Sequence, residues 1–495
     1  MSAAAAPGPR IAYAFAKQHG VLALGQEGEA VVVLVRPDAT VDGIAELRRV
    51  LQRPLLTRPV DAQRFAAELA RAYNEGAAAV TMQEELARDD LARLMQEVPP
   101  AADLLADEAK EPVIRMVNAL LLQALQERAS DLHFEPYESR SVVRFRVDGV
   151  LRDVVEPPRA LHAALVSRLK IMASLDIAEK RLPQDGRMAL RLAGRSVDVR
   201  VSTLPTGPGE RVVLRLLDRE SAKLDLAALG MSAATLAAVD RLIREPHGIL
   251  LVTGPTGSGK TTTLYAALSR LPRGSVNMMT VEDPIEYALD GVAQTQVNPR
   301  IDLDFARSLR AILRQDPDVI MIGEIRDLET AQIAVQASLT GHLVLATLHT
   351  NDAASAVTRL ADMGVEPYLL SSSLLGVLAQ RLVRTLCPAC RAAVAPDAGE
   401  RALLARMGVP DPGRVHAARG CDACGGSGYR GRTGIYELMV VDDAMRRAIH
   451  DGGGEEAVRA AMRASAAVPL RADGARWLAD GTTSLAELLR VTRDA

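Results

Sequence analysis

Short apolar segments that end in a polar or charged residue recur through the second half of the chain. Val319–Ile322 has the sequence VIMI, without polar alternation, and Gly248–Thr253 has the sequence GILLVT. Runs of this kind predict parallel strands that are buried on both faces of a sheet. Leu343–Leu348 and Asn277–Val281 follow the same pattern. We therefore predict an α/β domain with an open sheet, whose ligands bind at the carboxyl ends of the strands.

The first half of the chain carries more alternating patterns. Glu29–Val35 predicts a strand, and Thr40–Leu51 and Asp61–Tyr73 have helical periodicity. Val113–Arg128 predicts a strongly amphipathic helix. Five alternating runs after it predict the strands of an α+β unit: Leu132–Glu135, Ser141–Val147, Met188–Leu192, Ser196–Ser202 and Arg211–Leu217.

The chain of 495 residues is long enough for about three domains. We expect a small N-terminal domain over residues 1–75 and a linker over residues 76–105, which are rich in Ala, Asp and Glu. An α+β domain dense in arginine would occupy residues 106–228. The domain with the apolar strands would occupy residues 229–495.

A glycine-rich segment after one of the apolar strands matches the pattern G-x-x-x-x-G-K-[ST]. Thr262–Arg270 after it predicts a helix, and strand, glycine loop and helix together indicate a phosphate-binding loop. Backbone N–H groups would hold the β-phosphate, Lys260 would reach the β- and γ-phosphates, and the Thr261 hydroxyl would hold Mg²⁺. The predicted nucleotide-binding residues here are Gly254, Pro255, Thr256, Gly257, Ser258, Gly259, Lys260, Thr261 and Thr262.

Acids or a histidine follow three of the predicted strands. Glu324 is the candidate that orients or activates the attacking water, and the alternative is that it caps the next helix. Glu282 belongs to an acidic cluster with Asp283 and Glu286, and the spacing does not tell which of the three contacts Mg²⁺. His349 is a candidate sensor of the γ-phosphate, although a histidine at a strand end is commonly structural.

The four cysteines form two pairs, Cys387-x-x-Cys390 and Cys421-x-x-Cys424, with residues 391–420 between them. Paired cysteines at this range suit tetrahedral coordination of Zn²⁺ by four thiolates, and a redox pair or free thiols are the alternatives. We predict one zinc per chain in a module at about residues 384–435. The zinc would be structural, because four thiolates leave no open position for a substrate.

The composition narrows the classes of partner. A net charge of −3 argues against a general nucleic-acid binder. The closest candidate for a membrane span, Leu369–Ala379, contains three serines and ends at Gln380-Arg381, which makes it too short. The amino terminus lacks the basic start and apolar stretch of a secretory signal. We expect a cytoplasmic protein that reaches a membrane only through partners.

These motifs together resemble the secretion ATPases of the type II/type IV pilus superfamily, most closely the type II secretion ATPases of the GspE family. The resemblance covers about Glu111 to Thr492, whereas the first 110 residues contain no motif that we can match. Besides the phosphate loop and the four cysteines, it rests on ASDLHFEP (Ala129–Pro136), LPQDGR (Leu182–Arg187), VDVRVSTLP (Val197–Pro205), GERVVLRLL (Gly209–Leu217), TVEDPIEY (Thr280–Tyr287), LRAILRQDPDVIMIGEIRDLETAQ (Leu309–Gln332) and TGHLVLATLHT (Thr340–Thr350).

The resemblance implies a RecA-like P-loop ATPase domain, an α+β PAS-like second domain, a small N-terminal α/β domain and an inserted zinc module. It implies a homo-hexamer that hydrolyses ATP, peripherally bound to the inner membrane, and powers pseudopilus assembly and export of folded proteins across the outer membrane. The N-terminal domain would dock on the cytoplasmic domain of a GspL-type platform protein, with a GspF-type platform in the inner membrane as a further partner.

The resemblance also implies roles for individual residues. Glu324 would be the catalytic glutamate, Glu282 would support metal and water, and His349 would read the γ-phosphate. Four arginines are implied to face the nucleotide, whether in their own or a neighbouring subunit, because guanidinium groups fork onto phosphate oxygens: Arg200, Arg215, Arg310 and Arg314. Closure of the arginine-bearing domain on the γ-phosphate, and its release after hydrolysis, would be a power stroke.

Three other functions remain as alternatives. A type IV pilus assembly (extension) ATPase shares the chemistry, but such proteins usually have a longer N-terminal region. A nucleic-acid motor with a RecA-like core would show a basic strip with aromatic residues, which this sequence lacks. A nucleotide-binding scaffold without enzymatic activity is the third.

Overall fold

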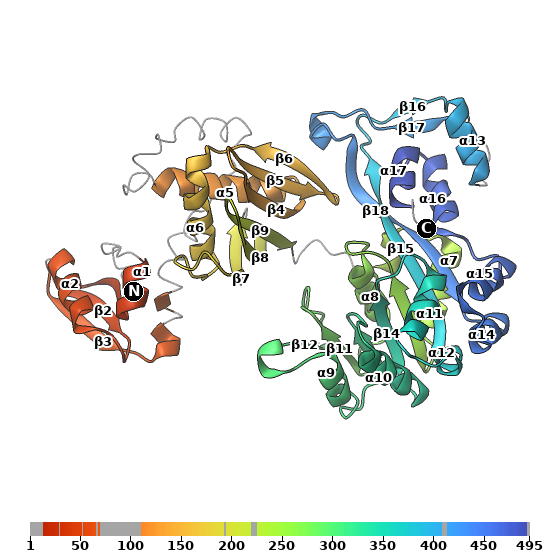
Figure 1. The fold of residues 1–495 in the computed structure, drawn as a ribbon, viewed down its shortest axis with the longest axis horizontal. Helices are drawn as coiled ribbons and strands as arrows, with labels where there is room; N and C mark the ends of the chain where they lie inside the picture. Colours follow the sequence, from red (N-terminus) through yellow and green to blue (C-terminus); the bar gives the residue numbers. More distant parts are fainter. Residues whose placement is uncertain are drawn as a thin grey trace. The chain divides into compact units, whose positions relative to one another are not determined.

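The structure is a computed structural model. It describes residues 13–28, 30–51, 53–65, 68–69, 110–192, 195–218, 225–407 and 413–492. The chain divides into two compact units, residues 1–220 and 221–495 (Figure 1). The predicted linker at residues 76–105 lies outside the described residues, as does most of the predicted helix beyond residue 65.

The first sheet of unit 1 has three strands in the order β1-β2-β3. β1 pairs antiparallel with β2, and β2 pairs parallel with β3. Val31 and Val33 of β2 are fully buried and pack with Leu47 of α2. The predicted strand and the first predicted helix are thereby confirmed. The elements are α1 (Tyr13–His19), β1 (Val21–Glu27), β2 (Ala30–Val35), α2 (Val41–Leu51) and β3 (Leu55–Pro59).

The second sheet of unit 1 is antiparallel, with six strands in the order β6-β5-β4-β9-β8-β7. One face packs against α5 and α6 through the apolar residues that alternate along the strands. The elements are α5 (Lys110–Gln126), β4 (Ala129–Pro136), β5 (Ser141–Val147), β6 (Val150–Val155), α6 (His162–Met172), β7 (Gln184–Leu192), β8 (Arg195–Thr206) and β9 (Gly209–Asp218).

The five strands predicted for this sheet are confirmed, and a sixth, β6, is additional. β7 begins four residues before its predicted start, so that Gly186 lies inside the strand instead of between strands. A Cβ at Gly186 would lie 2.6 Å from the backbone oxygen of Ala173, and glycine therefore permits a close backbone approach within the strand.

Unit 2 contains a seven-stranded sheet in the order β12-β11-β13-β14-β10-β15-β18. Neighbouring strands are parallel except β15 and β18, which are antiparallel. The strands are β10 (Gly248–Thr253), β11 (Met278–Glu282), β12 (Ala293–Gln296), β13 (Val319–Ile322), β14 (Leu343–Leu348), β15 (Leu374–Leu386) and β18 (Tyr429–Val440).

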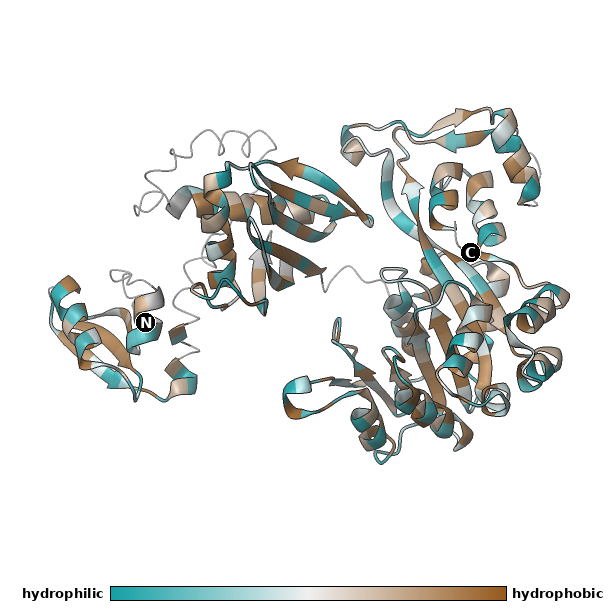
Figure 2. Ribbon diagram, in the orientation of Figure 1, coloured by the Kyte–Doolittle hydropathy of each residue, from teal (hydrophilic) through white to brown (hydrophobic). Residues whose placement is uncertain are grey.

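Helices cover both faces of this sheet. Ile320 and Ile322 of β13 belong to one apolar core, whereas Val319 and Met321 belong to the core on the opposite face. Figure 2 shows the resulting concentration of hydrophobic residues along the central strands. The helices are α7 (Ala233–Leu242), α8 (Lys260–Ser269), α9 (Phe305–Ile312), α10 (Leu328–Leu339), α11 (Ala353–Asp362), α12 (Pro367–Ser373), α14 (Asp443–His450), α15 (Gly454–Ala464), α16 (Leu470–Ala479) and α17 (Leu485–Val491).

The cysteine-bearing segment projects from the antiparallel pair β15 and β18. These strands pair from Gly376–Val440 as far as Leu386–Tyr429, immediately before Cys387. Between them lie β16 (Ala392–Val394), α13 (Ala398–Arg406) and β17 (Val415–Ala417). Within the described residues, no helix combines the length and the apolar character needed to cross a bilayer.

Candidate functional site

The predicted phosphate-binding loop connects β10 to α8. Gly259 caps α8 with a φ of 90°, a left-handed conformation that favours glycine. A Cβ at Gly254 would lie 2.5 Å from the backbone oxygen of Gln380, so that a side chain there would collide with backbone. The loop thus brings the N-terminus of α8 to the carboxyl end of β10, where backbone N–H groups form a site for an anion.

Side chains that follow the neighbouring strands β13 and β14 meet Lys260, the first residue of α8, beside this loop. Lys260 Nζ donates to two backbone oxygens of the loop, at 2.8 and 3.1 Å, and lies 3.5 Å from Nδ1 of His349. Nε2 of His349 lies 3.4 Å from Oε2 of Glu324, whose other oxygen accepts a hydrogen bond from Arg326. The structure therefore brings three predicted site residues, Lys260, Glu324 and His349, into one cluster.

The electrostatics of the cluster suit a polyanion. Burial lowers the pKa of Lys260 to about 8, with the charge of Glu324 acting against this shift and the charge of Arg381 adding to it. Burial also lowers the pKa of His349, and the charge of Lys260 contributes in the same direction. His349 is therefore neutral at neutral pH. A triphosphate beside them would raise both pKa values, because negative charge stabilises the protonated forms.

Glu282 lies at the end of β11, but its carboxylate is held in a separate buried network. It accepts hydrogen bonds from the hydroxyl groups of Tyr265 and Thr280 and from Nε2 of Gln294, the last at 3.0 Å. Burial raises the pKa of Tyr265, and the hydrogen bond to Glu282 adds to the shift. In these contacts Glu282 fixes α8 against β11 and β12 and does not touch Lys260 or Glu324.

The two arginines of the α9 region lie outside the Lys260–His349–Glu324 cluster. Arg310 pairs with Glu329 of α10, and Arg314 donates to the backbone oxygen of Arg310 at 2.8 Å. Both side chains are exposed. Their role toward the nucleotide therefore stays a prediction.

Arg200 and Arg215 occupy opposite positions on β8 and β9, and Arg215 is opposite Asp131 of β4. Nε of Arg215 donates to Oδ1 of Asp131 at 2.9 Å, and more than half of the Arg215 side chain is exposed. These arginines belong to unit 1 and the phosphate loop to unit 2. Their predicted action on the nucleotide is untested.

The four cysteines lie together at the far end of the β15–β18 pair. Their sulfur atoms all lie within 4.8 Å of one another, with separations of 3.9 Å for Cys387–Cys421, 3.9 Å for Cys390–Cys424 and 3.8 Å for Cys421–Cys424. A tetrahedral zinc ion with Zn–S bonds of about 2.3 Å requires S–S separations of about 3.8 Å. The donor set therefore fits zinc.

Backbone N–H groups also favour a thiolate at Cys424. Burial opposes the shift, but N–H donors of Cys421 and Gly428, at 3.2 and 3.1 Å from the sulfur, lower the pKa of Cys424 to about 6. The thiolate is the form of cysteine that binds metals.

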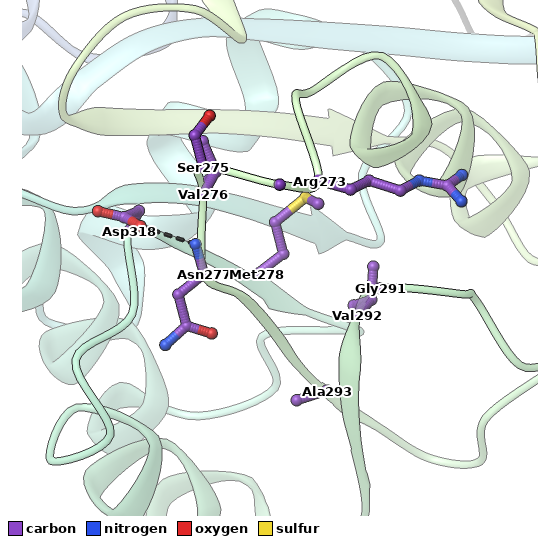
Figure 3. Close-up of a pocket in the computed structure, with 10 residues that line it drawn as sticks. Arg273, Ser275, Val276, Asn277, Met278, Gly291, Val292, Ala293 and Asp318 are labelled. Atoms are coloured by element: carbon purple, nitrogen blue, oxygen red, sulfur yellow. Dashed lines mark hydrogen bonds between the residues drawn. The ribbon is translucent and has the colours of Figure 1, made fainter.

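A hollow of about 740 Å³ lies at another part of unit 2 (Figure 3). Its lining includes Asn277, Ala293 and Asp318, which lie at the amino-terminal ends of β11, β12 and β13. Ligands of an open α/β sheet bind at the carboxyl ends of the strands. The hollow is therefore on the opposite edge of the sheet from the phosphate loop.

Two residues that contact the site were not predicted from the sequence. Arg326 pairs with Glu324 from the position two residues further on. Gln380 reaches the phosphate loop from β15. The available signal for Gln380 was its position with Arg381 as a polar pair that interrupts an apolar run.

Two family models match this chain. The model described as Type II/IV secretion system protein matches residues 106–490. A second model, which describes a domain of GSPII protein E, matches residues 10–73.

Curated relatives match almost the whole chain. The type II secretion system protein HxcR of Pseudomonas aeruginosa is 59% identical over 485 residues, which cover 98% of this chain and 99% of the relative. The type II secretion system protein E of the same species is 55% identical, with coverage of 100% and 98%. The type II secretion system ATPase E of Vibrio cholerae is 53% identical, with coverage of 92% and 91%.

Solved structures show a similar fold. The ATPase DotB of Legionella pneumophila has a TM-score of 0.56 at 21% identity, covering 77% of this chain and 96% of DotB. The pilus retraction motor PilT with bound ADP has a TM-score of 0.51 at 24% identity, with coverage of 76% and 97%. These similarities confirm the predicted RecA-like fold.

Proposed function

Because the chain belongs to the Type II/IV secretion system protein family, we propose that it is the ATP-hydrolysing motor of a type II secretion system. In this role it powers pseudopilus assembly and thereby the export of folded proteins across the outer membrane. The cluster of Lys260, His349 and Glu324 beside a phosphate loop is the observation that supports the chemistry most strongly.

The residues of the loop and of the cluster beside it can each take a separate role in phosphoryl transfer. The loop and Lys260 hold the β- and γ-phosphates, and Thr261 at the start of α8 binds Mg²⁺. Glu324 orients the attacking water, because it lies at the carboxyl end of the central strand β13. Neutral His349 accepts from Lys260 at Nδ1, and its one N–H, at Nε2, faces Glu324 in this structure. The same N–H would turn to the γ-phosphate when ATP is bound. Glu282 holds α8 in position by accepting a hydrogen bond from Tyr265.

Four arginines complete the proposed motor. Arg200 and Arg215 on the polar face of the six-stranded sheet, and Arg310 and Arg314 near α9, would close on the nucleotide in a homo-hexamer. The likeness to other secretion ATPases and the exposure of Arg215 support this part of the proposal. Release of the arginine-bearing domain after hydrolysis would supply the mechanical step.

The proposed domain assignment keeps the bounds predicted from the sequence, and the family matches over residues 10–73 and 106–490 support a division between residues 73 and 106. Residues 1–75 form the partner-docking domain, residues 76–105 the linker, residues 106–228 the arginine-bearing domain and residues 229–495 the ATPase domain. The protein acts in the cytoplasm, bound peripherally to the inner membrane through a GspL-type docking protein and beside a GspF-type platform.

One structural zinc per chain is expected at Cys387, Cys390, Cys421 and Cys424. Elemental analysis of freshly purified, reduced protein measures it directly. Replacement of Cys424 by serine should reduce the zinc content to near zero, because three thiolates bind zinc far more weakly than a complete tetrahedral set. Replacement of the exposed Ser427 by alanine is the matched control and should retain zinc. A zinc content near zero in the wild-type protein would reject the metal site.

The partner distinguishes this function from the type IV pilus assembly alternative. We expect the cytoplasmic domain of a GspL-type protein to bind the full chain and raise its ATP hydrolysis, and expect no response to the corresponding pilus component. A chain lacking residues 1–75 should lose the response and keep its basal activity, since the catalytic cluster lies in unit 2. Stimulation by the pilus component alone would favour the alternative function.

A further inference from the structure

Gln380 is a buried polar residue that the proposed chemistry leaves without a role. It lies in β15, the strand that pairs with β10 on the side away from β14. Only 1% of the residue is exposed. A glutamine amide at such a position must find hydrogen-bond partners for its donors and its acceptor, because unpaired polar groups are costly in the interior.

Both ends of the Gln380 amide bind the phosphate-loop segment. Nε2 donates to the backbone oxygen of Ser258 at 2.6 Å, and Oε1 accepts from the hydroxyl of Thr263 at 2.8 Å. Ser258 immediately precedes the capping Gly259, and Thr263 lies in the first turn of α8. The amide thus joins the loop to the helix start on the side opposite to the strand ends that carry Glu324 and His349.

Gln380 also restricts which residues the loop can carry at two of its positions. A Cβ at Gly254 would lie 2.5 Å from the backbone oxygen of Gln380, and a Cβ at Gly259 would lie 3.1 Å from its Nε2. Two of the three glycines of the loop, Gly254 and Gly259, therefore leave room for Gln380. Gln380 therefore lies against the first and the last glycine of the loop, and its amide also reaches Thr263 of α8.

The neighbouring residue ties this contact to the strand end that bears His349. Arg381 is buried, and its guanidinium donates to the backbone oxygens of Gln380 and Asn351 at 3.0 and 2.6 Å. Asn351 follows His349 by two residues. Arg381 thereby joins the backbone of β15 at Gln380 to the segment that follows β14 and bears His349.

We propose that Gln380 is a positioning residue for ATP, whose side-chain amide holds the phosphate loop and the start of α8 in the conformation that binds the β- and γ-phosphates. The proposal rests on the proposed ATPase function of the loop. Because Gln380 acts on the loop and not on the attacking water, its contribution is to binding in the ground state and transition state alike. Its loss should therefore raise KM for ATP and leave kcat nearly unchanged.

Gln380→Glu gives a test with a signature that a merely structural residue would lack. The side chain keeps its shape, but an ionised carboxylate places an acceptor against the backbone oxygen of Ser258. The protonated carboxyl can instead donate to that oxygen and still accept from Thr263. Burial raises the pKa of such a carboxyl, so protonation is within reach of mildly acidic buffer.

We expect Gln380→Glu to raise KM for ATP about tenfold relative to wild type at pH 8, because a buried hydrogen bond becomes a repulsive contact. The ratio of the two KM values should fall toward one as the pH is lowered to about 6, where the carboxyl gains its proton. Because the variant and the wild type are compared at the same pH, the titration of ATP and of Lys260 affects both KM values alike and does not change their ratio. Gln336→Glu, an exposed residue of α10, makes the same chemical change and should keep a KM ratio of one throughout.

Gln380→Met fills a similar volume without hydrogen bonds and should raise KM at all pH values alike. It keeps the test decisive if the glutamate variant fails to fold, which thermal unfolding of each variant would show. A KM ratio of one for both variants, or a pH-independent loss of kcat at unchanged KM, would overturn the proposal. If the Gln380 proposal fails while the wild type hydrolyses ATP normally in the same assays, the proposed function is unaffected. Inactive wild-type protein would instead refute the proposed function itself.

Discussion

Replacement of Glu324 by glutamine is expected to lower kcat for ATP hydrolysis by about 10²- to 10⁴-fold, the usual contribution of a positioned acid–base group. The glutamine keeps the size of the side chain but loses the charge that orients water. ATP binding should persist, because the loop and Lys260 are unchanged. Removal of a negative charge that faces Lys260 and His349 should even strengthen the binding of the triphosphate.

Phosphate release and retention of bound ATP, measured on the same sample, separate the two effects. Glu366→Gln is the matched control, since Glu366 is an exposed acid of the same unit that precedes α12 and makes no side-chain capping bond. Its turnover should equal that of the wild type. Turnover of the Glu324 variant at the wild-type rate would remove Glu324 from catalysis. The helix-capping alternative is wrong, because Asp327 caps α10 and its carboxylate accepts from the N–H of Thr330 at 2.8 Å.

Replacement of Lys260 by alanine is expected to weaken ATP binding by about 10- to 100-fold, the range for loss of a hydrogen bond to a charged group. Turnover should fall further, by about 10²- to 10³-fold, because the same cation faces the charge that develops on the γ-phosphate. Equilibrium binding of a fluorescent ATP analogue and steady-state hydrolysis measure these two quantities. Binding and turnover equal to those of the wild type would contradict the assignment of the loop.

The lowered pKa of Lys260 adds a pH dependence to the same experiment. Below pH 8 the side chain is charged before ATP arrives, whereas above about pH 8 it must take up a proton to bind the triphosphate. ATP affinity of the wild type should therefore fall as the pH rises through about 8, with proton uptake on binding. Lys260→Arg should bind ATP without this dependence, because a guanidinium stays charged throughout.

The proximity of Lys260, His349 and Glu324 could be predicted from the sequence because the segments that bear them follow apolar strands. The strand Val319–Ile322 has the bounds that the sequence predicts, since a short apolar run without alternation is typical of a strand buried on both faces. Parallel strands end at one edge of a sheet, and because β13, β14 and β10 are neighbours, this geometry brings Glu324 and His349 to the phosphate loop.

The partners of Glu282 could not be predicted in the same way. Its carboxylate contacts Tyr265 of α8 and Gln294 of β12, and both contacts require knowledge of which elements lie on either side of β11. The sequence indicated three neighbouring acids with a Mg²⁺ contact among them, whereas the structure gives Glu282 neutral hydroxyl and amide donors. Whether Glu282 also supports metal or water stays a prediction.

Gln380 shows a second limit of inference from sequence. It is separated from Ser258 by 122 residues along the chain, and their contact depends on β15 pairing with β10. Strand order in a sheet follows from packing and not from a local pattern, so a polar residue within an apolar run indicated a break and not a partner. Arg200 and Arg215, by contrast, lie on strands that are consecutive in the chain. A short connection joins β8 to β9, and the two arginines occupy paired positions on these strands.

Single-turnover cleavage of ATP by the full-length wild-type chain, with Mg²⁺ and the membrane-side docking partner present, tests most directly whether this cluster of lysine, histidine and glutamate hydrolyses ATP. We predict that one γ-phosphate is released for each ATP bound, and that removal of Mg²⁺ stops the release. ATP that remains bound and intact on the assembled wild-type protein would contradict that claim.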